Sequence, residues 1–160
     1  MLVAPPTLPQ MYPRQYAAIC DEARIVIVEA STKSGKTAGC LLWLLAQAWN
    51  SRGGGAFWWI APTFHVTKTV GFQRLCSMLQ QADPGKRTWK ANDSELCVTL
   101  ANGARVWFKS ADNPDSLYGE DVSAAVVDEA TRCSEDAWNA VRSTLTATRG
   151  CRDAPSSRRQ

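Results

Sequence analysis

The chain has one histidine, His65, and no long apolar run. A single histidine excludes a zinc site built from several histidines, and it leaves a Ser/His/Asp triad only one possible base, which argues against such a triad. The most apolar segment, Cys40–Trp49, has about ten residues where a membrane-spanning helix needs about twenty, so we interpret it as a buried helix. The first ten residues carry no basic side chain and contain prolines, which argues against a signal peptide. These absences predict a soluble, cytoplasmic protein.

Cysteine pairs and a strong net charge are also missing. The six cysteines are widely spaced without a C-x-x-C pair, so we expect reduced thiols, most of them buried. The net charge is +3, yet residues 1–148 are neutral, with 14 basic and 14 acidic side chains. Residues 1–110 hold 12 basic and 6 acidic side chains, and residues 111–148 hold 2 and 8. This asymmetry fits a basic face beside an acidic site, or an ordinary solvated surface.

The 160 residues, 45% of them apolar, are long enough for one globular domain and too short for two. The β-branched run RIVIVEA, Arg24–Ala30, predicts a buried strand, and Thr37–Arg52 predicts a helix that ends at three glycines. Ala56–Ala61 predicts a second strand, and Thr67–Gln81 a second helix. This alternation predicts an α/β fold whose central sheet is mostly parallel and flanked by helices.

Other segments extend this pattern. Arg14–Cys20 predicts a short helix. Two alternating runs flank Asn102-Gly103, the usual sequence of a type I′ turn, and predict an inserted β-hairpin. After a polar loop, AAVVD at Ala124–Asp128 predicts a buried strand with one unpaired edge. Ser134 is then expected to cap a helix that runs to about residue 145.

The segment ASTKSGKT, residues 30–37, matches the phosphate-loop pattern G-x-x-x-x-G-K-[ST], except that Ala30 replaces the first glycine. In such a loop the backbone N–H groups bind phosphate, Lys36 reaches the β and γ phosphates, and the Thr37 hydroxyl coordinates Mg²⁺. An ordinary turn between a strand and a helix is the alternative. The pattern therefore predicts ATP and Mg²⁺ as ligands. The predicted nucleotide-binding residues of the loop are Ser31, Thr32, Lys33, Ser34, Gly35, Lys36 and Thr37.

About ninety residues later, the strand AAVVD ends in Asp128-Glu129. A carboxylate at the end of a strand beside a phosphate loop can hold Mg²⁺, and the next carboxylate can orient water for attack on the γ-phosphate. We therefore predict Glu129 and Lys36 as catalytic residues, and Thr37 and Asp128 as metal ligands. The alternative for Glu129 is a favourable charge at the start of a helix.

Six motifs occur in order within residues 9–150: YPRQ, STKSGKT, WWIAPT, LANGARVWFKSAD, SLYG and VVDEA. Together they resemble the N-terminal ATPase domain of the terminase large subunit of tailed bacteriophages and prophages. The resemblance implies a helicase-like P-loop (ASCE) ATPase that drives packaging of double-stranded DNA into the procapsid. It also implies the terminase small subunit and the portal protein as partners, a homo-oligomer when full length, and the cytoplasm of a bacterial host.

The same resemblance assigns roles to single residues. Gln15, in YPRQ, matches a glutamine that contacts adenine; by itself it would read as a polar surface residue. Tyr118 stands where many relatives have arginine before the glycine of SLYG. A charge-stabilising arginine is therefore expected from elsewhere in the chain or from a neighbouring subunit. The substitution of glycine by Ala30 is tolerated in such loops.

A nucleic-acid surface is less well defined by the sequence. Thr63, Lys68 and Arg74 follow a segment that lies near the nucleic acid in relatives, so they are candidates for phosphate contacts. A helix cap and solvated charges are the alternative. We interpret Trp58 and Trp59 as core residues rather than as a stacking platform.

The last expectations concern the division of the chain into segments. The sequence stops soon after LTATRG. We expect an N-terminal arm over residues 1–13, a truncated ATPase domain over 14–150 without the nuclease domain, and a disordered basic tail over 151–160. Two alternative functions stay open: another helicase-like P-loop ATPase, and an inactive prophage remnant that only binds nucleotide.

Overall fold

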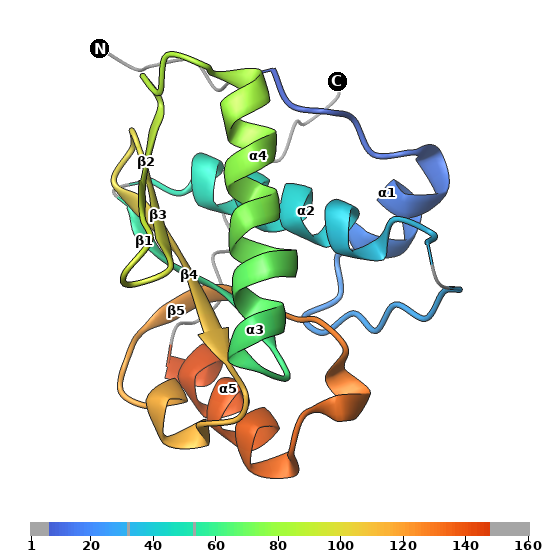
Figure 1. Cartoon of the computed structure of the whole chain (residues 1–160). Helices are drawn as coiled ribbons and strands as arrows, with labels where there is room; N and C mark the ends of the chain where they lie inside the picture. The colour runs from blue at the N-terminus through green and yellow to red at the C-terminus, as the bar shows by residue number, and fades with distance from the viewer. Residues whose placement is uncertain (1–6, 32, 53, 148–160) are drawn as a thin grey trace, which may run out of the picture.

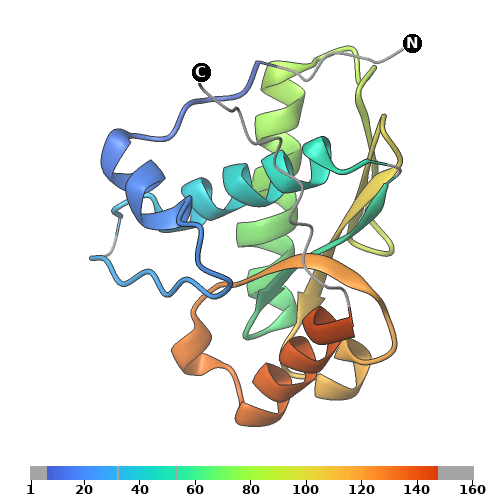
Figure 2. The same ribbon diagram turned by 180° about the vertical axis from the view of Figure 1, so that it is seen from behind.

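The computed structural model of the chain describes residues 7–31, 33–52 and 54–147. Its sheet has the strand order β2-β3-β4-β1-β5, in which β1 pairs in parallel with β4 and β5, and the β2–β3 and β3–β4 pairs are antiparallel. Helices α2 and α4 cover one face of the sheet, and α5 covers the other (Figures 1 and 2). The predicted α/β class with an inserted hairpin is confirmed. The strands are β1 Gly55–Ala61, β2 Trp89–Asn92, β3 Cys97–Leu100, β4 Ala104–Ser110 and β5 Val122–Val127.

The helices lie close to their predicted positions. Thr63 caps the second predicted helix, because its hydroxyl oxygen accepts a hydrogen bond from Val66 N, and this helix continues through a π-helical turn into α4. The predicted cap at Ser134 is confirmed by a 3.2 Å bond from Ala137 N to its Oγ. None of the described helices is long and apolar enough to cross a membrane. The helices are α1 Pro13–Ile19, α2 Lys36–Asn50, α3 Phe64–Val66, α4 Gln73–Ala82 and α5 Glu135–Ala147, with the π-helical turn at Thr67–Phe72.

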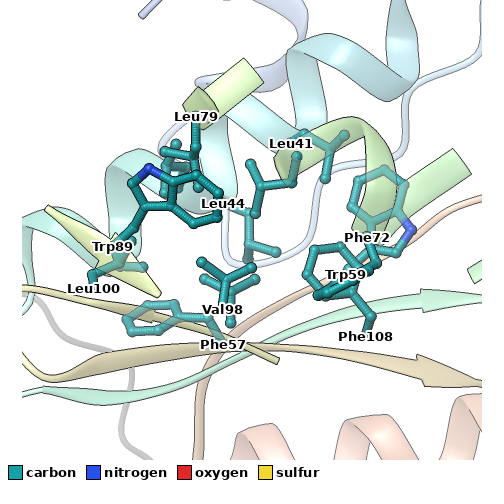
Figure 3. Packing of buried hydrophobic residues seen from close by; sticks show 14 of the residues in the cluster. Leu41, Leu44, Phe57, Trp59, Phe72, Leu79, Trp89, Val98, Leu100 and Phe108 are labelled. Atoms are coloured by element: carbon teal, nitrogen blue, oxygen red, sulfur yellow. The ribbon is translucent and has the colours of Figure 1, made fainter. Parts of the chain in front are cut away.

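The main core lies between the sheet and the helices α2 and α4 (Figure 3). Leu41 and Leu44 of α2 pack there with Trp59 of β1, and the Phe72 and Phe108 rings meet edge to face, 5.5 Å apart. On the opposite face of the sheet, Trp58 and side chains of α5 form a smaller core. Both tryptophans are fully buried, so their prediction as core residues is confirmed.

The hairpin turn differs from the prediction. Of the pair Asn102-Gly103, only Gly103 has a positive φ, +86°, whereas a type I′ turn needs a positive φ at both residues. The Asn102 side chain instead donates to the carbonyl oxygens of Ala48, Trp49 and Ser51 at 2.9, 2.9 and 3.3 Å. These bonds tie the turn to the end of α2, which sequence alternation cannot reveal.

The predicted strand Arg24–Ala30 is wrong. This segment runs outside the sheet with no strand pairing, and the side chains of Ile25 and Ile27 are 55% and 85% exposed (Figure 2). A β-branched run specifies a strand only where a neighbour supplies backbone partners and cover. Within the described part of the chain, β5 has a strand on one side only, so its predicted unpaired edge is confirmed.

Candidate nucleotide-binding site

The phosphate-loop residues precede α2, so they lie at the positive end of a helix. Gly35 is the residue before α2 and has a φ of +82°, a conformation that glycine adopts without strain. Lys33 also has a positive φ, +65°. The loop and the helix of the predicted strand–loop–helix unit are therefore present, whereas the strand is not. Thr32 lies outside the described residues.

Lys36 folds back onto its own loop. Its ammonium donates to the carbonyl oxygens of Ala30 and Ser31, the latter at 3.0 Å. A triphosphate that binds here must replace these neutral acceptors, and charged phosphate oxygens are the stronger partners of an ammonium group.

Gln15 extends from α1 to the loop, and both the nitrogen and the oxygen of its side-chain amide are hydrogen-bonded. Its Nε2 donates to the carbonyl oxygens of Ser34 and Gly35 at 3.3 and 3.1 Å, and its Oε1 accepts from Tyr12 N at 2.9 Å. A Cβ at Gly35 would lie 2.2 Å from the same Nε2. The structure thus brings Gln15 to the predicted site as a support of the loop, and adenine recognition by this residue stays a prediction.

Thr37 and Asp128 meet at the end of the sheet. The Thr37 hydroxyl donates to Asp128 Oδ2 at 3.2 Å, and Asp128 N donates to the carbonyl of Ile60 at 2.8 Å, which holds the aspartate just beyond β5. Burial raises the pKa of the Asp128 carboxyl above its ordinary value, against the opposing effect of the Thr37 hydrogen bond. A hydroxyl and a carboxylate oxygen so close together are ligands that suit Mg²⁺.

Glu129 follows in a left-handed backbone conformation, with φ 50° and ψ 44°. Its backbone N donates to Asp128 Oδ1 at 3.1 Å. Its side chain forms an ion pair with Arg132, with 2.6 Å between Nη1 and Oε2. Sequence reasoning missed Arg132, although an arginine three residues after a predicted catalytic acid was a usable signal. Glu129 is the residue before the 3₁₀ helix Ala130–Arg132, and its side chain makes no capping hydrogen bond there, so its alternative role as a charge at a helix start stays open.

Two cysteines, Cys40 and Cys133, lie near Asp128, and Cys20 lies near Cys40. Burial, aided by the negative charge of Asp128, raises the pKa of the Cys40 thiol to about 11. Burial likewise raises the pKa values of Cys20 and Cys133. Such thiols stay protonated at neutral pH and are poor nucleophiles and metal ligands. The described cysteines are free, as predicted. Among them only Cys97 is fully buried, so the prediction that most are buried is wrong. Cys151 lies outside the described residues.

The three candidates for phosphate contacts, Thr63, Lys68 and Arg74, belong to one helical stretch and its cap. Lys68 is half-buried and Arg74 exposed on the helix that starts after Thr63, whose hydroxyl is occupied as a cap. Tyr118 is exposed. The nucleic-acid role of Thr63, Lys68 and Arg74 stays a prediction.

Two hollows in the described surface lie away from the predicted site. One, of about 300 Å³, lies between α4 and β2, and Lys86 and Trp89 are among the residues that line it. The other, about 450 Å³, lies at the start of the parallel strands and includes Arg105 and Trp107. The predicted nucleotide residues lie at the opposite end of these strands, where Ser31, Lys33 and Ser34 are exposed and Lys36 and Thr37 are half-buried.

Comparisons with known proteins concern the family and the fold of the chain. Residues 27–151 match the family described as "Terminase large subunit, T4likevirus-type, N-terminal". A search of curated proteins finds no sequence match. The fold is similar to that of the large terminase ATPase domain of Thermus phage P74-26, with 20% identity and a TM-score of 0.74 over 88% of this chain and 62% of that chain. It is also similar to the large terminase of a thermophilic bacteriophage, with 15% identity and a TM-score of 0.61 over 72% of this chain and 29% of that chain.

The two kinds of comparison carry different weight. At these identities the solved structures show a shared fold, and this chain spans less than two thirds of either one. The family match covers most of the chain, including the predicted phosphate loop and the pair Asp128-Glu129. The chain therefore belongs to the terminase large subunit family, of the T4likevirus type, and represents its N-terminal part.

Proposed function

We propose that the chain is the ATP-binding and ATP-hydrolysing motor domain of a terminase large subunit, which drives double-stranded DNA into the procapsid. The hydrogen bond between Thr37 and Asp128 carries this proposal. It joins the loop before α2 to the carboxylate after β5, and these are the two parts that a P-loop ATPase needs in one place. Membership of the family supports the packaging role.

The loop and Lys36 would bind the triphosphate. Backbone N–H groups at the start of α2 would donate to the anion, and the helix dipole favours negative charge there. Lys36 would exchange the carbonyl oxygens of Ala30 and Ser31 for phosphate oxygens. Gln15 would keep the loop in shape through Ser34 and Gly35.

Thr37 and Asp128 would hold the magnesium ion. Their two oxygen atoms converge at 3.2 Å, and Mg²⁺ commonly takes one or two such protein ligands and keeps several waters. When bound, the ion would neutralise negative charge on the β and γ phosphates. The bond from Asp128 N to the Ile60 carbonyl oxygen holds the Asp128 backbone, and the bonds from Thr37 and Glu129 N orient its carboxylate.

Glu129 would orient the attacking water and accept its proton. Tyr118 brings no positive charge where many relatives have arginine, so a charge-stabilising arginine would come from elsewhere in the chain or from a neighbouring subunit. The proposal includes the terminase small subunit and the portal protein as partners, assembly of the full-length protein as a homo-oligomer, and action in the cytoplasm of a bacterial host.

The test uses purified protein of this sequence. Titration calorimetry with Mg²⁺ and ATP should show binding that Lys36→Ala abolishes. Phosphate release should be slow, and a DNA-unwinding assay should show no strand separation, which distinguishes a packaging motor from a helicase. Absence of ATP binding by the folded wild-type protein would contradict the proposal.

A further inference from the structure

In the short turn after β5, the Glu129 side chain is hydrogen-bonded to the Arg132 side chain. We propose that Arg132 is a positioning residue, which anchors one carboxylate oxygen of Glu129 and thereby sets the direction of the other. This inference rests on the proposed function, because that function gives Glu129 its task. It adds a residue that none of the motifs in the sequence contains.

Two bonds connect the same pair of residues. Arg132 N donates to the Glu129 carbonyl oxygen at 2.8 Å, and Arg132 Nη1 donates to Glu129 Oε2 at 2.6 Å. The first bond closes the 3₁₀ turn Ala130–Arg132, and the second fixes the side chain that leaves this turn. The left-handed backbone of Glu129, uncommon for a residue with a Cβ, sets the starting direction of its side chain.

The ion pair is needed because little else restrains this carboxylate. The side chains of Glu129 and Arg132 are 46% and 61% exposed, so packing does not fix them. Oε1 of Glu129 accepts no hydrogen bond from the described residues, so Arg132 supplies the side-chain anchor of this acid there. A guanidinium group suits this task, because it stays charged and holds its donors in a rigid plane.

The other charged groups of the site are occupied. Lys36 is bonded to two loop carbonyl oxygens, and Asp128 accepts from Thr37 and from the Glu129 backbone. With Oε2 held, the free Oε1 atom keeps a constant direction from which to bind water. Loss of the anchor would let the carboxylate rotate, and misplacement of a reacting group by about 1 Å can reduce a rate by about a hundredfold.

The experiment compares Arg132→Ala, Arg132→Lys and Arg52→Ala. Arg52 is a matched control, since it is exposed and lies beyond the far end of the 15-residue helix α2. Arg132→Ala should lower kcat by about tenfold to a hundredfold. KM for ATP, the affinity for the analogue AMP-PNP and the melting temperature should stay at wild-type values. Arg132→Lys should recover part of the rate, and Arg52→Ala should match the wild type.

A double variant tests whether the effect passes through Glu129. In a Glu129→Gln background, Arg132→Ala should cause little further loss of single-turnover rate. A full additional loss, an unchanged kcat or an increased kcat in Arg132→Ala would overturn the proposal. The proposal would also be overturned if the wild-type protein bound AMP-PNP but hydrolysed no ATP. In that case the phosphate-loop assignment would still hold. A wild-type protein that binds no nucleotide would overturn the proposed function itself.

Discussion

Thr37 Oγ1 and Asp128 Oδ2 are hydrogen-bonded at 3.2 Å, although 91 residues separate them. Two local features make this contact possible. The left-handed Gly35 ends the loop so that α2 starts with Lys36 and Thr37, and the bond from Asp128 N to the Ile60 carbonyl extends the pairing of β5 with β1. The pair is therefore placed by backbone geometry from both sides.

Lys36→Ala should remove most ATP binding and leave the fold intact. The ammonium contacts only loop carbonyl oxygens among the described residues, so its loss should not affect the core. A charge-assisted contact of this kind contributes about 1.5–3 kcal/mol, or about tenfold to a hundredfold in affinity. Titration calorimetry checks this, with the exposed Lys90→Ala as control. Equal affinity in Lys36→Ala and wild type would refute the phosphate-loop assignment.

Glu129→Gln and Asp128→Asn should have different effects. The glutamine keeps the shape of the side chain and cannot accept a proton, so turnover should fall about 10²–10⁴-fold while ATP still binds. Asp128→Asn should weaken the magnesium-dependent part of ATP binding, because it removes a charged ligand beside Thr37. Calorimetry with and without Mg²⁺ separates the two. The assignment of roles fails if both variants lose ATP binding equally while folded.

Gln15→Ala should weaken ATP and GTP binding to the same extent. Its amide is engaged by Ser34, Gly35 and Tyr12, so it acts on the nucleotide through the loop. Loss of these bonds should cost about 1 kcal/mol, close to a fivefold loss of affinity. Competition binding with both nucleotides measures the ratio. A loss confined to ATP would show that the glutamine reads adenine, as the family resemblance implies.

Asp83 should make the fold sensitive to acid. Hydrogen bonds from the Thr88 side chain at 2.7 Å and its backbone N at 2.8 Å hold the pKa of the Asp83 carboxyl below its ordinary value. The folded state then binds this proton less readily than the unfolded state. The stabilisation is present above the unfolded pKa, about 3.9, and is lost as the pH falls through the lower folded value. Urea unfolding at pH 7 and pH 3 should show a smaller change in Asp83→Asn than in wild type; identical changes would exclude this role.

Much of the site was predictable because it depends on short-range chemistry. The loop ASTKSGKT and the pair Asp128-Glu129 carry residue types whose roles follow from phosphate and Mg²⁺ chemistry, and the structure brings Thr37 and Asp128 into contact. The helix boundaries followed from caps such as Ser134. Residues whose partners are distant were not predictable. Asn102 bonds to the end of α2, and no local pattern shows that contact.

Some of the strands were likewise predicted from the sequence, and others were not. β1, β4 and β5 have neighbours in the described sheet and were predicted. The four-residue strand β2, Trp89–Asn92, was missed, because it is short and three of its four residues are exposed. The segment 24–30 was predicted as a strand because its β-branched residues prefer one, yet pairing depends on a neighbour that the pattern does not encode. Long-range partners, rather than local preference, account for these differences.

A matched pair of isoleucine substitutions tests the position of this segment. Ile27 is 85% exposed, whereas Ile60 near the end of β1 is fully buried. Ile27→Ala should therefore change the free energy of unfolding by less than about 0.5 kcal/mol. The same change at Ile60 should cost about 2–5 kcal/mol, because it removes buried contacts and leaves a cavity. Urea unfolding followed by tryptophan fluorescence measures both, since the buried Trp58 and Trp59 report on the core around β1. Comparable losses in the two variants would mean that Ile27 is buried in the sheet, as its sequence pattern predicts, and that the exposed position of this segment is wrong.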